Sequence, residues 1–256
     1  MKELVNIVKL GGRVVEDENA LNRLLDRFQG IQGHRILVHG GGKTATSLAS
    51  DLGIGSRMID GRRITDADTL KVVTMVYAGL VNKNIVAKLQ ARGINAAGLC
   101  GADFNIIRSQ KRAAVPIDYG FVGDIREVNA GVLASILNSG IVPVICPITH
   151  DGNGGLLNTN ADTVASAVAE SLCREFDVRL TFCFESKGVL LDAGDPDSVI
   201  ARMNREDYAG YLESGVISGG MIPKLDNAFK ALEAGVECVT VTDAEGLGEP
   251  GGTLIV

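Results

Sequence analysis

Short apolar runs alternate along the whole chain with longer segments in which apolar residues recur every three or four positions. The first run covers residues 4–10, and it is followed by four apolar residues at helical spacing, Leu21, Leu24, Leu25 and Phe28. Strands that alternate with helices are typical of helices packed on both faces of a parallel sheet. The sequence therefore predicts an α/β fold, a three-layer αβα sandwich around a mainly parallel open sheet.

The same pattern predicts the remaining elements. Further strands are expected over residues 35–39, 96–99, 141–145, 179–184, 189–191, 238–242 and 253–256. Further helices are expected over residues 44–52, 205–213 and 224–234, and from Asn160 or Asp162 to Glu170. Another helix is expected to begin after the cap Asp66, with a buried stripe of Leu70, Val73, Tyr77 and Leu80. Residues 105–128 alternate and contain turn residues, which predicts a hairpin over the sheet that could act as a lid. A soft lobe boundary is expected near Asp177.

Composition excludes several classes of protein. The chain has 256 residues with 25 Lys and Arg against 31 Asp and Glu, a net charge of −6, which argues against nucleic-acid binding. No apolar run reaches the roughly 20 residues that span a bilayer, and the N-terminus has no targeting pattern. Five cysteines without CxxC or zinc spacing fit a reducing compartment. We therefore expect a cytoplasmic protein that binds neither nucleic acid nor membranes.

Glycine clusters follow or precede predicted elements at three places: Gly11-Gly12, Gly40-Gly41-Gly42 and Gly219-Gly220. Glycines there let backbone N–H groups approach an anion, and a following helix adds its positive end. Tight turns explain any single cluster equally well. Two familiar motifs are excluded, because a Walker A loop needs a glycine where Leu37 stands and Gly53-Ile54-Gly55 lacks the third glycine of a dinucleotide fingerprint, at Met58.

Two lysines lie in unusual positions beside these loops. Lys9 is near the end of an apolar strand, where an unpaired ammonium is costly to bury. Lys224 follows Pro223 and opens a predicted helix, where the macrodipole disfavours a cation unless an anion is also bound. Together they indicate a phosphate site. Arg63 could clamp a carboxylate or lie on the surface, and Asp162 could cap a helix or orient the lysines.

The motifs together resemble the amino-acid kinase family. They cover residues 9–12, 39–42, 61–65, 120–123, 158–162 and 219–224, and their order and spacing extend over essentially the whole chain. The resemblance implies an αβα sandwich with an N-terminal lobe, residues 1–177, for acylated amino-acid binding and dimerisation. A C-terminal lobe, residues 178–256, would bind ATP.

The resemblance also implies an activity. ATP would phosphorylate the side-chain carboxylate of an N-acyl-L-glutamate, first of all N-acetyl-L-glutamate, to an acyl phosphate in arginine biosynthesis. The implied catalytic residues are Lys9, Lys224 and Asp162, and the implied substrate-binding residues are Gly41, Gly42, Arg63, Asn158 and Asn160. The implied nucleotide-binding residues are Gly11, Gly12, Glu185, Ser186, Lys187, Gly188, Val189, Leu190, Val216, Ile217, Ser218 and Gly220.

This chemistry needs no general base, because a carboxylate is already deprotonated at neutral pH. His39 borders the expected site and is interpreted as structural. ATP implies Mg²⁺, but no carboxylate cluster marks a protein-borne metal site, so phosphates and water would hold the ion.

Some features depart from the family pattern or leave the acceptor open. Glu185 stands where similar kinases usually carry Asp, and the segment from Thr240 to Gly252 is shorter and richer in glycine. A succinyl in place of an acetyl group would need another cation, for which Arg108, Lys111 and Arg112 are the candidates.

Two different functions are weighed against this activity. The first is a kinase of the same family that acts on another acceptor, and the second is a non-catalytic sensor of an amino acid or nucleotide. The presence of Lys9, Asp162 and Lys224 argues against a sensor, because a sensor has no phosphoryl group to position.

The start of the first strand near Met1 bears on assembly. It leaves no room for the extra N-terminal helix of the hexamer-forming, arginine-inhibited relatives. A homodimer insensitive to arginine is therefore expected.

Overall fold

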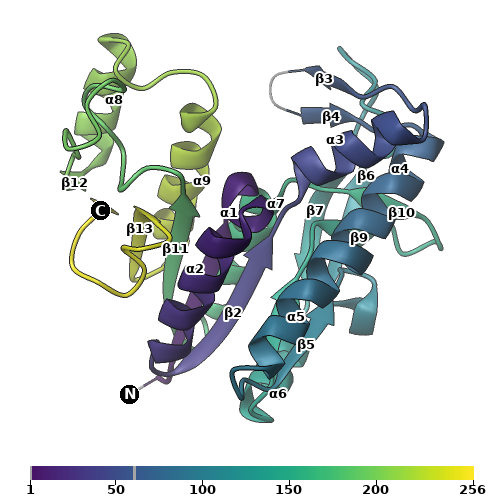
Figure 1. Ribbon diagram of the computed structural model, residues 1–256, viewed down its shortest axis with the longest axis horizontal. Coiled ribbons are helices and arrows are strands. Elements are labelled where there is room, and N and C mark those ends of the chain that lie inside the picture. Colours follow the sequence, from purple (N-terminus) through teal and green to yellow (C-terminus); the bar gives the residue numbers. More distant parts are fainter. Residues whose placement is uncertain (1, 60–61) are drawn as a thin grey trace. The chain divides into compact units, whose positions relative to one another are not determined.

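The computed structural model describes residues 2–59 and 62–256, so Met1, Asp60 and the predicted motif residue Gly61 lie outside the described residues. The chain forms two compact units, residues 1–35 with 165–256 and residues 36–164. Both units combine strands with helices, and many of their elements are labelled in Figure 1. The predicted α/β class is confirmed. The expected lobes with a boundary near Asp177 stay a prediction.

The first unit is built on five strands in the order β12 (Arg202–Met203), β14 (Thr253–Ile255), β13 (Cys238–Asp243), β11 (Asp177–Phe184) and β1 (Leu4–Leu10). The central strands β1, β11 and β13 are parallel, and β14 is antiparallel to β13. Ile7 and Val8, consecutive residues that face opposite sides of β1, are both buried. Burial on both faces explains why this strand reads as a continuous apolar run.

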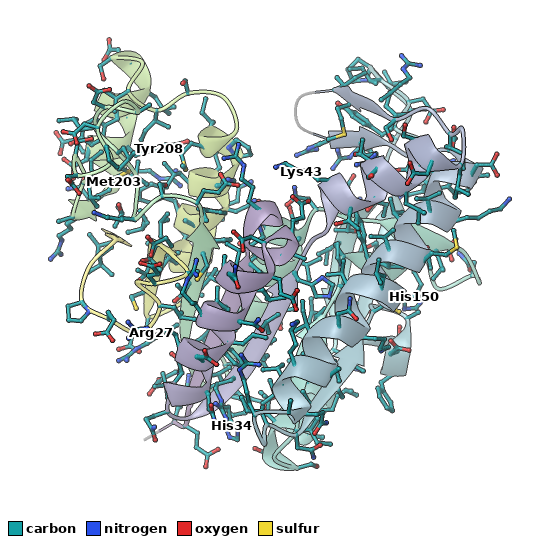
Figure 2. The ribbon with its side chains drawn as sticks, in the orientation of Figure 1. Arg27, His34, Lys43, His150, Met203 and Tyr208 are labelled. Carbon is teal, nitrogen blue, oxygen red and sulfur yellow. The ribbon has the colours of Figure 1, made fainter. Side chains whose placement is uncertain are left out.

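Helices α1 (Gly12–Glu16), α2 (Glu18–Gly30), α8 (Arg205–Glu213) and α9 (Met221–Glu233) belong to the first unit. The Asp17 carboxylate caps α2 by accepting from the amides of Asn19 and Ala20. The predicted apolar stripe of α2 is fully buried. The hydroxyl of Tyr208 on α8 donates to the carboxylate of Asp226 at 2.9 Å. Figure 2 labels Tyr208 together with Met203 in the same part of the first unit.

The second unit contains the parallel strands β8 (Val142–Ile145) and β5 (Ala96–Leu99) and all but the first two residues of β2 (His34–His39). Its helices are α3 (Gly42–Asp51), α4 (Ala67–Thr74), η1 (Met75–Val81), α5 (Asn82–Gln90) and α6 (Ala130–Asn138), together with the short 3₁₀ turn η2 (Asp103–Asn105). Helix α7 (Ala161–Leu172) begins in this unit and continues into the first. Strands β3 (Arg57–Ile59) and β4 (Arg62–Ile64) form a small antiparallel pair.

The predicted hairpin is confirmed as the antiparallel pair β6 (Ile107–Lys111) and β7 (Gly123–Val128). It belongs to a four-stranded sheet with β9 (Ile148–His150) and β10 (Leu156–Asn158), two strands that the sequence pattern did not predict. Strands of three residues are too short to show an alternation of apolar and polar positions. The suggested lid function stays a prediction.

The predicted stripe on the helix after Asp66 is partly wrong. Asp66 caps this helix through the Thr69 amide, and Val73 and Tyr77 are buried as expected. Leu70 is only half-buried and Leu80 is 53% exposed. The chain adopts a π-helix from Met75, which has more residues per turn than an α-helix, so the buried face moves off the α-helical spacing.

Two further expectations are corrected. Residues 189–191 do not form a regular strand, because only Leu190 makes an isolated bridge, with Val199. Helix α9 begins at Met221 and not at Lys224. Pro223 is its third residue, where the missing N–H costs nothing because the first amides of a helix have no partner within the helix. Within the described parts of the chain, no helix is long and apolar enough to cross a membrane.

Candidate functional site

Lys9 and Lys224 lie against the same aromatic ring in the first unit. The Lys9 Nζ is 5.2 Å from the centroid of Phe184, and the Lys224 Nζ is 3.7 Å from it. Lys9 is only 6% exposed, and Lys224 is half-buried. Both distances are within the range of a cation–π interaction. The fold therefore brings together the two lysines that the sequence singled out, although they are far apart along the chain.

Gly11 lies beside the same ring, at the end of β1. Its amide donates to the carbonyl of Cys183 at 2.7 Å. A Cβ at this position would meet that carbonyl at 2.9 Å and the Phe184 ring at 3.3 Å. Glycine is therefore required here by the close approach of two strands. Gly12 begins α1, and a Cβ there would have nothing within 4 Å.

The predicted nucleotide segment after β11 is held by its own polar contacts. Glu185 forms an ion pair with Arg13 at 3.3 Å, and Lys187 forms one with Asp197 at 2.6 Å. The Ser186 hydroxyl donates to the Gly188 carbonyl. A Cβ on Gly188 would meet Thr253 Oγ1 at 2.7 Å, so this glycine also lies where two segments of the chain approach closely.

The backbone of the same segment is tied to β14. The amide of Val189 donates to Thr253 Oγ1 at 2.8 Å, and Val189 is buried. The second predicted nucleotide segment, Val216 to Ser218, precedes α9, with Ile217 buried and Gly220 at the helix N-terminus. All predicted nucleotide-binding residues thus lie in the first unit.

Gly41 and Gly42 begin α3 in the second unit. Gly41 has φ +146°, and a Cβ there would meet Tyr77 and Val81 at 3.2 Å. The carbonyl of Gly42 accepts from the Arg63 Nη2 at 2.8 Å. The glycine loop and the predicted arginine are therefore in direct contact.

Arg63 is 7% exposed, so it is not the surface residue that the sequence also allowed. Besides Gly42, its guanidinium donates to Thr46 Oγ1 at 2.7 Å and to Ser56 Oγ at 2.9 Å. Burial raises the pKa of the Tyr77 hydroxyl, and the neighbouring Arg63 acts against this rise. These three partners of Arg63 are uncharged, since they are two hydroxyl groups and a carbonyl.

Asn158 connects two other predicted motifs. Its side-chain amide donates to Thr65 Oγ1 at 3.0 Å, and its backbone amide donates to the carbonyl of Phe121. Gly120 has φ +72°, and a Cβ there would lie 2.2 Å from the Thr65 carbonyl. The described parts of the motifs at residues 61–65, 120–123 and 158–162 therefore meet in the second unit.

Asn160 and Asp162 lie at the start of α7. The Asn160 Oδ1 accepts from the amides of Asp162 and Thr163 at 2.8 and 3.1 Å, so the capping residue is Asn160. Asp162 is 9% exposed and lies in the first turn, where the helix dipole favours a negative charge. The expected role of Asp162 in orienting the lysines stays a prediction.

His39 has the surroundings of a structural residue. It is fully buried, and burial lowers its pKa to about 4. Its Nδ1 contacts the Gly40 carbonyl at 2.8 Å, while its Nε2 lies 3.0 Å from the amide nitrogen of Asn82. Because the Asn82 amide donates and the carbonyl accepts, the hydrogen-bond network assigns the proton to Nδ1.

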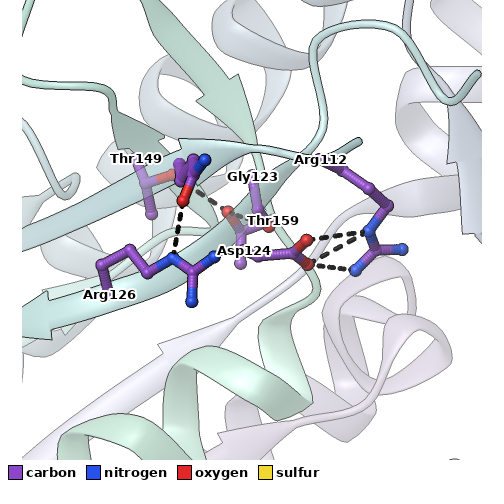
Figure 3. Close-up of polar contacts among 7 residues, drawn as sticks. Arg112, Gly123, Asp124, Arg126, Thr149 and Thr159 are labelled. Carbon is purple, nitrogen blue, oxygen red and sulfur yellow. Dashed lines mark hydrogen bonds and ion pairs between the residues drawn. The ribbon is translucent and has the colours of Figure 1, made fainter. Parts of the chain in front are cut away.

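The three cations considered for a second substrate carboxylate all have partners in the β6–β7 hairpin. Arg108 pairs with Glu127 at 2.6 Å, and Lys111 lies 4.8 Å from the centroid of the Phe121 ring. The Arg112 Nε contacts both carboxylate oxygens of Asp124 at 3.1 and 3.2 Å (Figure 3). Arg108 and Arg112 are thus already matched to carboxylates of this chain.

Two further observations concern possible ligand sites. Among the described residues, no group of three or more His, Cys, Asp or Glu could hold a metal ion. A cavity of about 560 Å³ in the first unit is lined by residues of β1, β11, α2 and the loop before β14, among them Asn6, Arg27, Thr181 and Glu249. None of the predicted site residues lines this cavity.

Sequence reasoning missed Phe184, Arg13, Tyr77, Thr46 and Ser56. Arg13 is the partner of Glu185, and Thr46 and Ser56 hold Arg63. For Thr46 the sequence offered a signal, because a residue four positions after Gly42 lies next to Gly42 on the surface of a helix. The contact of Arg13 with Glu185 joins residues that are distant in the sequence, and the contact of Ser56 with Arg63 depends on the turn between β3 and β4, so neither has a signal in the local pattern.

Comparisons with known proteins find relatives that match essentially the whole chain. The model of the amino acid kinase family matches residues 5–243. A protein of Phocaeicola vulgatus described as acetylglutamate kinase is 58% identical over 255 residues, which are 100% of this chain and 99% of that protein. One of Methanopyrus kandleri with the same description is 40% identical, over 98% of this chain and 100% of that protein.

Solved structures show the same fold. A crystal structure of a Streptococcus mutans protein has a TM-score of 0.84 at 27% identity and covers 98% of both chains. Carbamate kinase from Giardia lamblia bound to AMP-PNP has a TM-score of 0.67 at 14% identity, over 100% of this chain and 98% of that one. The extent of the family match and the full-length relatives lead to one conclusion: this chain belongs to the amino acid kinase family.

Proposed function

We propose that this chain transfers the γ-phosphoryl group of ATP to the side-chain carboxylate of N-acetyl-L-glutamate and so forms an acyl phosphate for arginine biosynthesis. The full-length relatives described as acetylglutamate kinase support the substrate. The observation that best supports phosphoryl transfer is that the ammonium groups of Lys9 and Lys224 both contact the ring of Phe184. Gly11, which follows β1, lies beside the same ring.

In this proposal the first unit binds ATP. The backbone of Gly11, Gly12 and Gly220 would approach the phosphates, and the segments 185–190 and 216–218 would hold the nucleoside. Lys9 and Lys224 would stabilise the transferring group, whose negative charge is spread over three oxygens in the transition state. Preformed positive charges are effective here because they need no rearrangement during the reaction.

The second unit would bind the acylated amino acid. Arg63 is suited to clamp a carboxylate, because its guanidinium is planar and its bonds to Gly42, Thr46 and Ser56 fix its orientation. Gly41, Gly42, Asn158 and Asn160 would contribute hydrogen bonds to the substrate. Asp162 would orient the lysines.

The remaining requirements of the reaction are few. The acceptor carboxylate is ionised at neutral pH, so the protein needs to align the reactants and not to remove a proton. Mg²⁺ would be held mainly by the phosphates of ATP and by water, and it would neutralise part of the negative charge of the phosphates. That mode is compatible with the residues present, since it does not require a cluster of protein carboxylates.

We also propose that the protein is a cytoplasmic homodimer. All five cysteines are free, which is consistent with a reducing compartment. Met75 and Leu80 of η1 are 52% and 53% exposed and could contribute apolar area to an interface. Sedimentation equilibrium would give twice the mass of one chain, whereas a monomer at micromolar concentration would contradict the dimer.

The activity is tested by ATP turnover with hydroxylamine, which traps acyl phosphates as hydroxamates. The assay is run on N-acetylglutamate, N-succinylglutamate, glutamate and aspartate, with a reaction lacking ATP as the control. Hydroxamate should form fastest from N-acetylglutamate. A preference for N-succinylglutamate would correct the acyl group, and the absence of hydroxamate from all four substrates would favour a sensor.

A further inference from the structure

We propose that Phe184 is a positioning residue for phosphoryl transfer, whose π face holds the ammonium groups of Lys9 and Lys224 in place. This inference rests on the proposed function. It assigns a role to a residue at the end of β11 that carries no reactive group.

The distances define the arrangement. Each ammonium nitrogen is within cation–π range of one ring centroid, at 5.2 and 3.7 Å. The two nitrogens are therefore no further apart than the sum of these distances. One ring thus gathers two charges that repel each other, one from β1 and one from α9.

The register of the sheet explains how Lys9 reaches the ring. Lys9 on β1 is opposite Phe182 on β11, so both side chains project from the same face. Phe184 lies two residues further along β11 and therefore projects from that face as well. Its ring stacks on Phe182 with centroids 6.0 Å apart and planes at 14°.

The ring is held rigidly. Phe184 is 5% exposed. Gly11 packs closely against its ring, since a Cβ on Gly11 would lie 3.3 Å from the ring. Its backbone is paired with Asp243 of β13. A fixed ring can define where the flexible lysine side chains end, which is what a preorganised electrostatic site requires.

An aromatic ring can position an ammonium group without carrying a charge of its own. The quadrupole of the Phe184 ring attracts the cation without carrying a net charge, so the ring adds no negative charge that would repel the phosphates of ATP. The effect is largest where water is excluded, and Lys9 is 6% exposed.

The test replaces Phe184 by 4-fluoro-, 3,5-difluoro- and 3,4,5-trifluorophenylalanine in the full chain. Fluorine withdraws charge from the π face while the shape of the ring changes little, so a packing role would be insensitive to the series. The matched control places the same residues at Phe182, which stacks on Phe184. Thermal unfolding of each variant confirms that it is folded.

Along the Phe184 series, kcat for acyl phosphate formation should fall stepwise, by roughly tenfold at the trifluoro residue. The KM for the acylated amino acid should not change, and the Phe182 series should be flat. The Phe184→Leu variant, which keeps an apolar side chain without a π face, should lose at least as much kcat. A flat Phe184 series in an active enzyme would overturn the inference.

A second readout separates this inference from the proposed function. The Kd of AMP-PNP with Mg²⁺, measured by calorimetry, should rise in the same order along the Phe184 series whatever the acceptor is. An inactive parent protein that still shows this ordered rise would reject the proposed acceptor and keep the role of Phe184. Equal affinities across the series would reject the role of Phe184 alone.

Discussion

Arg63 donates a hydrogen bond from Nη2 to the carbonyl of Gly42 at 2.8 Å and so joins strand β4 to the first residue of α3. The motifs at residues 39–42 and 61–65, which are separate in the sequence, are therefore in direct contact. The guanidinium also bridges Thr46 and Ser56, so Arg63 supports this part of the chain in addition to its proposed role in binding a carboxylate. Loss of this side chain should have consequences for both binding and stability.

We expect Arg63→Ala to raise the KM for the acylated amino acid by at least tenfold while the Kd of ATP changes little. The free energy of unfolding should also fall, by about 1–3 kcal/mol, because a buried carbonyl loses its charged donor. Steady-state kinetics and urea unfolding measure the two effects. The control is Arg62→Ala, since Arg62 is the exposed neighbour in the same strand. Equal weakening of both substrates would contradict the assignment.

Gly11 and Gly12 should respond differently to the same substitution. Gly11→Ala places a Cβ 2.9 Å from the Cys183 carbonyl and forces β1 and β11 apart, which should cost about 1–3 kcal/mol of unfolding free energy. Gly12→Ala meets open space at a helical position and should be neutral or slightly stabilising. Urea unfolding compares the pair. Similar losses in both variants would show that the close approach is not the cause.

Lys9→Ala and Lys224→Ala should each lower kcat by roughly 10²-fold or more, the scale for loss of one preorganised contact to the transition state. Circular dichroism should show that both variants fold. The control is Lys43→Ala, since Lys43 is an exposed lysine beside the other glycine loop. A near-normal kcat in both variants would remove the lysines from the mechanism.

His39 should make the protein less stable in mild acid. Burial lowers its pKa to about 4, whereas an unfolded histidine titrates near 6.5. The unfolded state therefore binds a proton first as the pH falls below about 6.5, and this draws the equilibrium towards unfolding until the folded pKa is reached. The loss between these pH values is about 3 kcal/mol.

The measurement is the unfolding free energy of the parent protein and of His39→Gln between pH 7 and pH 4. Glutamine does not titrate, so the difference between the two proteins should shrink or reverse as the pH falls. A constant difference over this range would contradict a neutral, buried His39.

Much of the fold followed from hydrophobic spacing. Strand β1 and helix α8 have the predicted bounds, and the stripe of α2 is buried as predicted. The same spacing failed at Leu80, because the π-helix from Met75 changes the number of residues per turn. Strands β9 and β10 were missed because three residues show no period.

The site was predictable to a lesser extent. Lys9 and Lys224 could be singled out because each is costly where it stands, one in an apolar strand and one near a helix start. Their common partner Phe184 could not be found in this way, since an aromatic residue at a strand end is ordinary and only the register of β1 against β11 places it beside Lys9. The partners of Arg63 could not be assigned either, because the helical spacing relates Thr46 to Gly42, and only the folded chain places Thr46 and Ser56 beside Arg63.

The most direct test of the account is a crystal structure with MgADP, aluminium tetrafluoride and N-acetylglutamate, in which the fluoride complex mimics the migrating phosphoryl group. We predict that the Nζ atoms of Lys9 and Lys224 both lie within about 3.2 Å of this group or of the oxygen atoms next to it. If either ammonium group points away from the complex, the two lysines do not act together on the phosphoryl group, and the account is wrong.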